Sequence, residues 1–388
     1  MNEKEVLKVA LMQCNNYDLE LIIKKINEGI EILGGWEKYI KPNSTVLLKP
    51  NMISPKKPET AITTHPVFLQ AMIRILKSMN CTVWIGDSSG GLFGGTSPTK
   101  QSFIVTGYAE IAEKENAVIK NFDMEGTVKI IPNSGLTPEM NIAKPMFEAD
   151  YVINLPKLKT HVAALYTGAM KNLFGCIPGL KKAEYHKIGS KSEDFANIIV
   201  DINEAVYVTL NIMDAIVAMD GDGPTGGNPY EMHKILISDN ALALDMTATK
   251  MINVDSKEVP ILKAAINRKF GPESFKDVYV DGDYEHVPTV VNFKLPRTMN
   301  RLSNSKLAAK IMPYAVDFTK SRPKVNLKSC KQCNMCVNSC PVEAINIETK
   351  EISYDKCIEC MCCHELCLYH AVELKKLNPL AGMIKRKK

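Results

Sequence analysis

Nine of the twelve cysteines in this 388-residue chain lie between residues 330 and 367. Four of them follow one another with two, two and three residues in between, and the same pattern recurs 27 residues later. The runs are Cys330, Cys333, Cys336 and Cys340, and then Cys357, Cys360, Cys363 and Cys367. Thiolates at this spacing are typical ligands of iron–sulfur clusters, which carry electrons.

The similarity between the two runs extends past the cysteines, because Ala344-Ile345 corresponds to Ala371-Val372 at the same offset. An internal repeat of this kind indicates two related halves. In such an arrangement three cysteines of one run hold one cluster and the fourth binds the other cluster. The sequence therefore predicts two 4Fe–4S clusters, one on Cys330, Cys333, Cys336 and Cys367, the other on Cys357, Cys360, Cys363 and Cys340. The alternative is two zinc sites. Zinc is commonly held by two pairs of cysteines, so it needs neither a third cysteine at the same spacing nor a fourth cysteine from the other run.

Residues 327–376 resemble the bacterial-type two-cluster ferredoxins. The segment departs from that pattern at two positions. Leu368 stands where the second run would have the counterpart of Pro341. Cys362 is an additional thiol beside a predicted ligand, either an inert neighbour or an alternative ligand after oxidative damage.

The rest of the chain reads as an α/β protein. Short buried strands are predicted at 5–13, 45–48, 82–86 and 151–155, with helical segments at 18–33 and 65–79 between them. Strand alternating with helix predicts a mostly parallel sheet covered by helices. The predicted organisation is an α/β domain over 1–295, with two subdomains meeting near 150 as a variant. A basic connector (296–326), an α+β ferredoxin domain (327–376) and a basic tail (377–388) follow.

Composition and charge narrow the classes of function. Apolar content of 45% and charged content of 23% are ordinary for a soluble globular protein. The first residues lack the features of a signal peptide and no apolar run approaches membrane-spanning length, so we expect a cytoplasmic protein. Basic charge is concentrated in the connector and the tail, which makes nucleic acid an unlikely partner. The connector is expected to lie across an acidic surface of the same chain, or to contact a partner or a membrane face.

Polar side chains cluster directly after the predicted strands. In parallel sheets, functional groups gather beyond the carboxyl ends of the strands. The candidate binding residues are Lys49, Asn51, Asp87, Ser88, Lys157, Lys159, Thr160, Thr167 and Asn172, and the candidate catalytic residues are His161 and Lys171. Lysines that emerge from neighbouring strand ends predict a site for a carboxylate or phosphate. The alternative is that each is a solvated surface lysine.

Three further features call for interpretation. Gly221, Gly223 and Gly226 match a dinucleotide-binding pattern, but Pro224 interrupts the loop and the following HKILISD reads as a strand, so we do not expect a nicotinamide site. Asp214, Asp220 and Asp222 suit either a divalent ion or, more simply, turns. Cys14 lines the predicted pocket or packs in the core.

The stretches VLLKPN, TTHP, IGDSSGG, NLPKLKTH, TGAMKNLFG and MDGDGPTGGNP resemble the uncharacterised domain family numbered 362, over residues 5–290. The resemblance implies an α/β domain from anaerobic bacteria and archaea, often fused to a ferredoxin module, and it supplies no reaction. The sequence favours an oxidoreductase in which the ferredoxin segment takes electrons from a soluble donor and delivers them to an anionic substrate or cofactor in the α/β domain. The alternative is an electron-transfer or assembly partner without turnover. No flavin motif is evident, and a flavin or other organic cofactor remains open.

Overall fold

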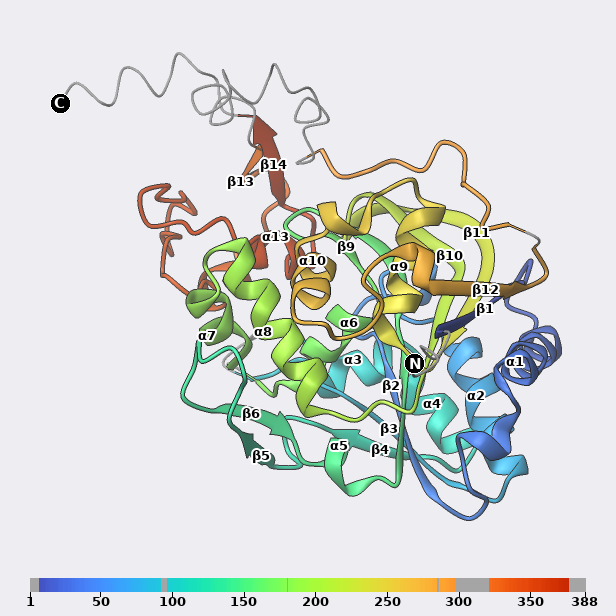
Figure 1. Cartoon of the computed structure of the whole chain (residues 1–388). Coiled ribbons are helices and arrows are strands. Elements are labelled where there is room, and N and C mark those ends of the chain that lie inside the picture. The colour runs from blue at the N-terminus through green and yellow to red at the C-terminus, as the bar shows by residue number, and fades with distance from the viewer. Residues whose placement is uncertain (1–6, 92–95, 180, 285, 298–320, 377–388) are drawn as a thin grey trace, which may run out of the picture.

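The structure is a computed structural model, and it describes residues 7–91, 96–179, 181–284, 286–297 and 321–376. Most of the predicted connector and all of the predicted tail lie outside these residues. The described residues form an α/β body and a small cysteine-rich unit, and the two are in contact (Figure 1).

The body is built on one sheet, ten-stranded in the described part of the chain, whose main path runs β12-β1-β11-β10-β7-β2-β3-β4 with β8 and β9 attached beside β10. Most pairings are parallel, and β11 runs antiparallel to β1 and β10. The strands are β1 (Leu7–Gln13), β2 (Thr45–Pro50), β3 (Thr82–Asp87), β4 (Val118–Asn121), β7 (Tyr151–Leu155), β8 (Lys157–His161), β9 (Leu165–Thr167), β10 (Leu210–Asp222), β11 (Gly226–Ser238) and β12 (Val278–Gly282). A separate hairpin pairs β5 (Thr127–Ile130) with β6 (Met140–Ala143).

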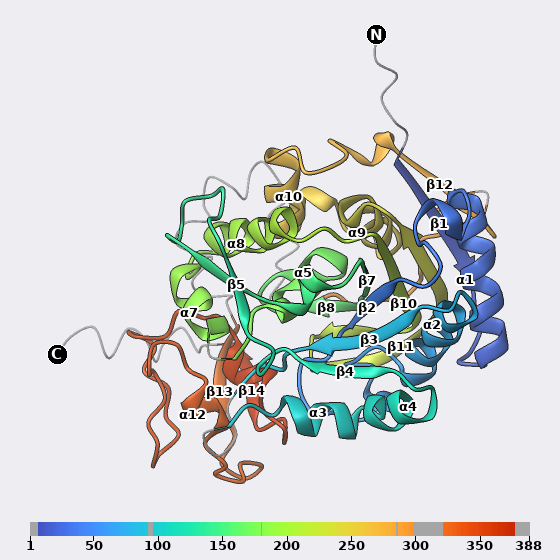
Figure 2. The same ribbon diagram turned by 90° about the horizontal axis from the view of Figure 1, so that it is seen from below.

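Helices cover both faces of the sheet, as the alternation of strand and helix predicts. The helices of the body are α1 (Leu19–Leu33), α2 (Pro66–Ser78), α3 (Thr99–Val105), α4 (Tyr108–Lys114), α5 (Pro145–Glu148), α6 (Ala169–Asn172), α7 (Lys181–Ile188), α8 (Ser192–Ala205), α9 (Ala241–Met251) and α10 (Pro260–Asn267). In Figure 2, α8, α9 and α10 lie on one side of the strands and α3 and α4 on the other.

The side-chain alternation along the strands explains this layering. In β2, Val46 and Leu48 face the core under α1, α2 and α4, whereas Leu47 faces the core under α8, α9 and α10. Successive side chains of a strand point to opposite faces, so a run that is apolar throughout is buried on both sides. The α/β fold class is therefore confirmed. Because β7 pairs with β2, strands from before and after residue 150 share one sheet.

One local expectation needs revision, and the structure agrees with another. The residues after Leu155 form a further strand, β8, where only a loop is expected from the sequence; Pro156 separates β8 from β7, and its carbonyl accepts a hydrogen bond from Asp214 N–H. The glycine-rich loop at 221–226 joins two antiparallel strands, β10 and β11, and no helix follows it. That arrangement agrees with the reading of HKILISD as a strand.

The cysteine-rich unit contains the strands β13 (Ser321–Val325) and β14 (Val372–Lys376), which pair antiparallel, and the short helices α12 (Met335–Asn338) and α13 (Cys362–Glu365). It therefore begins within the segment predicted to be connector. The described ends of that segment do meet acidic side chains of the chain. Arg297 Nε lies 2.5 Å from Asp222, and Arg322 Nε lies 2.7 Å from Glu359.

Candidate functional site

The two cysteine runs adopt the same backbone conformation. Positive φ angles occur at equivalent positions in both halves: 52° at Gln332 and 55° at Glu359, 60° at Asn334 and 64° at Met361. Left-handed residues alternating with right-handed ones turn successive N–H groups into a concave, anion-binding surface. This is the backbone that a cluster carrying thiolates and sulfides requires.

Hydrogen bonds to sulfur repeat with the same offset. Ala344 N–H donates to Cys340 Sγ at 3.2 Å, and Ala371 N–H donates to Cys367 Sγ at 3.1 Å. These two alanines are the ones that correspond in the sequence repeat. Peptide donors to cysteine sulfur stabilise the thiolate form that binds iron.

The thiols of the two runs lie close enough to influence one another's ionisation. Burial raises the pKa of Cys336 to about 11, and the nearby charges that raise it further are those of Cys367, Cys330 and Cys333. Burial also raises the pKa of Cys363 well above its usual value, with contributions from Cys360 and Cys357, then from Cys336 and Cys340.

The residues present therefore fit two 4Fe–4S clusters, and the assignment of individual ligands stays a prediction that these proximities support. No three histidine, cysteine or acidic side chains of the described residues meet closely enough to hold one metal ion. A 4Fe–4S cluster is a wider group held by four thiolates.

The second half of the repeat packs on the α/β body through α13 and the residues after it. Leu366 lies against Gly90 so closely that a Cβ built on this glycine would be 2.9 Å from Leu366 Cδ2. His364 approaches Gly226 in the same way, because a Cβ built on Gly226 would be 2.9 Å from His364 Nε2. Lys56 of the body donates to the Leu368 carbonyl at 2.8 Å, at the position where the proline is missing. The glycines of the DSSGG stretch thus permit close contact between the two units.

A cavity with a volume of about 110 Å³ lies at this junction. We call it the lysine cavity. Its lining from the body includes Lys49, Asn51, Asp87, Ser88, Thr167, Lys171, Asn172, Lys182 and His186. Its lining from the cysteine-rich unit is Ser339, Cys362, Glu365 and Leu366. Seven of the residues predicted from strand ends therefore meet at one cavity.

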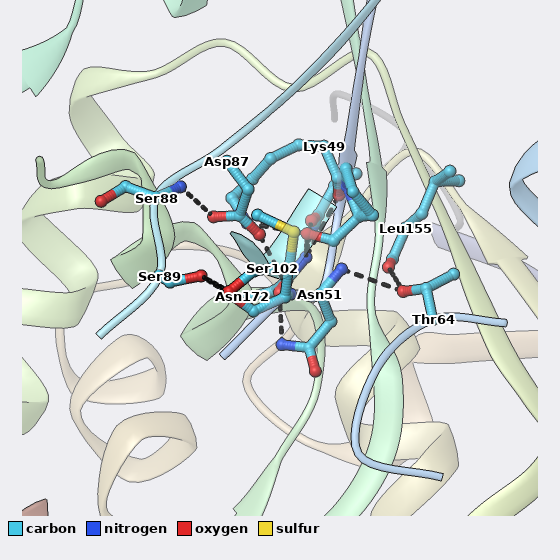
Figure 3. A network of polar contacts seen from close by, with 12 residues as sticks. Lys49, Asn51, Thr64, Asp87, Ser88, Ser89, Ser102, Leu155 and Asn172 are labelled. Carbon is cyan, nitrogen blue, oxygen red and sulfur yellow. Dashed lines mark hydrogen bonds and ion pairs between the residues drawn. The ribbon is translucent and has the colours of Figure 1, made fainter. Parts of the chain in front are cut away.

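A buried ion pair forms the floor of the lysine cavity. Lys49 Nζ lies 2.9 Å from Asp87 Oδ2 and also donates to the Pro50 carbonyl (Figure 3). Burial raises the pKa of Asp87, and the charge of Lys49 opposes that rise. Asp87 accepts further hydrogen bonds from the N–H groups of Ser88 and Met52. A buried carboxylate with this many donors holds the ends of β2 and β3 together.

A chain of amide side chains runs from this floor into the sheet. Asn51 donates to Asn172 Oδ1 at 2.8 Å, and Asn172 donates to Asn154 Oδ1 at 2.7 Å. Lys159 Nζ reaches Asn51 Oδ1 at 2.6 Å from below. Each donor thus faces an acceptor, so the network fixes the orientation of amides whose two ends are otherwise alike.

Lys171 is held in place by its own short helix. Asp245 accepts from the N–H groups of Ala169 and Met170, at 2.7 and 3.0 Å, and burial raises its pKa to about 6. Burial lowers the pKa of Lys171, while the nearby carboxyl of Glu365 acts in the opposite direction. Within the described residues, the Lys171 ammonium has no hydrogen bond or ion pair. It is the lysine of the cavity that is left free for a ligand.

Three residues of this region were missed by the sequence reasoning. Lys182 donates to the carbonyls of Ser88 and Ser89 and to Ser88 Oγ, and burial lowers its pKa to about 8. Asp123 accepts from the hydroxyls of Ser88, Ser97 and Thr99, each at 2.5 Å. His186 follows Lys182 by one helical turn, and this spacing in α7 was the available signal for both.

Four predicted residues are placed outside the lysine cavity. Lys157 Nζ is bound to Asp214 at 2.8 Å and to Tyr17 at 2.7 Å, and Lys159 lies behind Asn51. Thr160 Oγ1 accepts from Gly223 N–H at 3.3 Å. His161 Nε2 lies 3.2 Å from Glu365 Oε1, without the geometry of a hydrogen bond. His161 thus reaches the cavity only through Glu365.

The remaining candidates have structural surroundings. Asp214 binds Lys157, Asp220 accepts from Lys294 N–H, and Asp222 accepts from Arg297. Each of these carboxylates already has a partner in the chain. Cys14 is packed in the core under α1, where burial raises its pKa to about 11. Cys362, in contrast, is part of the cavity wall.

Comparison with known proteins places the chain in a family. The model described as "Domain of unknown function (DUF362)" matches residues 46–250, more than half of the chain. The chain belongs to this family. A second model, "4Fe-4S dicluster domain", matches residues 322–368, the cysteine-rich unit described above.

Two similar proteins are informative as points of reference. The chain is 28% identical over 295 residues to the "Thylakoid-associated protein sll1697" of Synechocystis, covering 76% of this chain and 89% of that protein. The structure of the lactate racemase apoprotein from Thermoanaerobacterium thermosaccharolyticum aligns over 63% of this chain and 56% of the racemase, with a TM-score of 0.39 and 16% identity. The chain thus spans little more than half of the racemase. No helix among the described residues is long and apolar enough to cross a membrane.

Proposed function

We propose that the chain is an iron–sulfur oxidoreductase that reduces a small anionic molecule bound in the lysine cavity. The observation that carries the proposal is the composition of the cavity wall. Lys171 and Lys182 come from the α/β body, and Cys362 and Glu365 come from the segment that holds Cys360 and Cys363. A bound anion would therefore touch both units at once.

The chain's own residues bind and orient the substrate in this proposal. Lys171 supplies an amine that forms no hydrogen bond or ion pair among the described residues, and a carboxylate or phosphate is the matching ligand for its charged form. Lys49 is already bound to Asp87, so it stiffens the floor and does not contribute a free charge. Leu366 and Phe174 add apolar surface to the cavity wall, and charge interactions are stronger beside low-dielectric surface than in open water.

The two 4Fe–4S clusters that the cysteines would hold supply single electrons at low potential. The more exposed first half of the repeat faces the predicted soluble electron donor. Fusion of the two units in one chain keeps the electron-carrying part next to the bound substrate at a high effective concentration.

A second function is favoured by the surface of the cysteine-rich unit. Leu327, Ile347 and Tyr369 are exposed there by 65%, 55% and 44%. Exposed apolar side chains of this size suit contact with another protein. In this alternative the chain passes electrons to a protein partner, or helps to assemble one, without turnover of its own.

The test begins with mass spectrometry of small molecules released by denaturing anaerobically purified protein. The anion identified, or acetate and inorganic phosphate as probes if none is released, is then titrated against the full chain. Lys171→Ala is expected to weaken binding more than tenfold while iron content stays unchanged. Lys263→Ala, which removes an exposed lysine of α10, is the matched control and should leave binding within twofold. Equal affinity in the Lys171→Ala variant would contradict the proposed site, and a co-purifying protein with no bound anion would favour the alternative.

A further inference from the structure

A second and larger cavity adjoins the same segment of the cysteine-rich unit. Its volume is about 330 Å³, and binding sites for small organic molecules begin at a volume of roughly 300 Å³. His161, Phe195 and Ile261 line it from the body, and Cys360 and Met361 line it from the cysteine-rich unit. We call it the histidine cavity. Residues 358–366 therefore wall both cavities.

The lining of the histidine cavity suits an uncharged ligand. None of the described residues that line it is a lysine or an arginine. Its one carboxylate, Glu359, is bound to Arg322 at 2.7 Å. Both imidazoles are held neutral, since burial lowers the pKa of His161 well below its usual value and that of His186 to about 3. An anion that the lysine cavity would accept thus has no counter-charge here.

The same lining favours a ring. Phe195 and His186 are stacked in the wall with centroids 4.6 Å apart, and Met361 adds a polarisable thioether. Aromatic and thioether groups pack well against the faces and edges of a flat ring. The rest of the wall combines aliphatic side chains, such as Val162 and Ile261, with the uncharged hydroxyls of Ser190, Ser192 and Ser321.

One residue that lines this cavity carries a buried donor without an acceptor. His161 Nδ1 accepts from the N–H groups of Ala163 and Ala164, both at 3.1 Å, so in the neutral ring the proton is on Nε2. Nε2 has no hydrogen-bond acceptor among the described residues, because Glu365 Oε1 is near but misaligned. A buried donor without an acceptor is costly, and a carbonyl oxygen of a ligand would satisfy it.

We propose that the histidine cavity binds an uncharged quinone-class ring, with a ring carbonyl accepting from His161 Nε2–H and the ring lying against Cys360 and Met361. This site is distinct from the lysine cavity and does not depend on which anion binds there. In this proposal His161, which the sequence analysis names as a candidate catalytic residue, binds a ligand outside the lysine cavity.

Duroquinone is a suitable probe because it is uncharged and its ring carbons are all substituted, so it does not alkylate thiols. Calorimetric titration of the anaerobic, cluster-loaded chain should show saturable binding. Ala163→Trp places a large side chain at the exposed mouth of the cavity and should weaken binding at least tenfold. Lys171→Ala, in the other cavity, should leave it within twofold. Absence of saturable binding, or unchanged binding in Ala163→Trp, would overturn the proposal.

Durene, the same tetramethyl ring without carbonyl oxygens, tests the hydrogen bond. It should bind several-fold more weakly than duroquinone to the unmodified chain, and His161→Phe should remove that difference. Equal affinities of the two probes in the unmodified chain would overturn the assignment of a carbonyl-bearing ring. Failure of this site would leave the anion titration of the lysine cavity unaffected, so the two proposals fail separately.

Discussion

The two halves of the cysteine-rich unit share a backbone and differ in what surrounds them. In α12, Met335 and Cys336 are buried, whereas all four residues of α13 are buried against the rest of the chain. Position 339 of the first half is a serine, and the equivalent Leu366 fills the space beside Gly90. The repeat therefore builds two similar cysteine-bearing loops, of which the second is more deeply buried and supplies three of the four cavity-lining residues that come from this unit.

The backbone of the cysteine-bearing loops is common to the two halves, whereas their burial is set by the neighbouring α/β body. Thiolate spacing and left-handed residues recur because both halves contain the same cysteine-bearing loop. Burial is not part of the repeat, since it depends on contacts with DSSGG and with Gly226. An exposed half suits exchange of electrons with a partner, and an enclosed half suits delivery to a bound molecule.

The largest expected effect comes from equivalent ligand replacements. Cys336→Ala and Cys363→Ala should each remove one cluster, about half of the iron and sulfide. Only Cys363→Ala should also weaken anion binding in the lysine cavity, since it disturbs α13. Iron analysis, low-temperature electron paramagnetic resonance and anion titration measure the three properties. Equal anion affinity in the two variants would contradict the proposed difference between the two halves.

A smaller effect is expected where the second half is made to resemble the first. Leu366→Ser should weaken the contact between the units by about 2 kcal/mol, as for other large-to-small changes at buried positions. Amide exchange of residues 86–91 should become faster while the iron content is retained, as followed by hydrogen–deuterium exchange. Ile347→Ser, at an exposed position of the first half, is the control and should change neither. Unaltered exchange in Leu366→Ser would show that the packing against Gly90 is unimportant.

The smallest expected effect is on the pH dependence of anion binding. Burial lowers the pKa of Lys182 to about 8, and the facing carboxylates Asp123 and Asp87 oppose this shift. Lys182 is thus positively charged below pH 8 and loses its charge above it, so affinity should fall about tenfold between pH 7 and pH 9. Lys182→Arg should make the profile shallower because arginine stays charged. A flat profile in the unmodified chain would exclude Lys182 from the binding charge.

Much of the fold was predictable because it rests on local patterns. The strand at 82–86 and the helix at 18–33 appear within two residues of their predicted bounds, as β3 and α1. Apolar residues at strand or helical spacing, together with the glycine pair Gly34-Gly35 directly after the helix, identify such elements without knowledge of their neighbours. β8 escaped prediction because KLKTH has the composition of a loop, and it is a strand because it pairs with β10 and β9.

The candidate site was predictable in part for the same reason. Lys49 and Asp87 end adjacent parallel strands, so their meeting follows from strand order. Lys182 and Asp123 could not be placed, since a helix and a loop bring them to Ser88 from elsewhere in the chain. Lys157 and Lys159 were grouped with Lys171 by sequence, but their amines are bound to Asp214 and to Asn51, respectively.

The sequence by itself determined the chemistry of the cysteines, since ligand type, spacing and a 27-residue repeat are all local properties of the chain. It also determined that lysines follow buried strands. Only the tertiary structure decided which lysine is left without a partner, because pairing depends on carboxylates that arrive from distant segments. It alone decided that Cys362 and Glu365 face Lys171 across one cavity, and that His161 faces another. Burial and charge pairing are properties of packed neighbours, and the linear order of residues does not specify them.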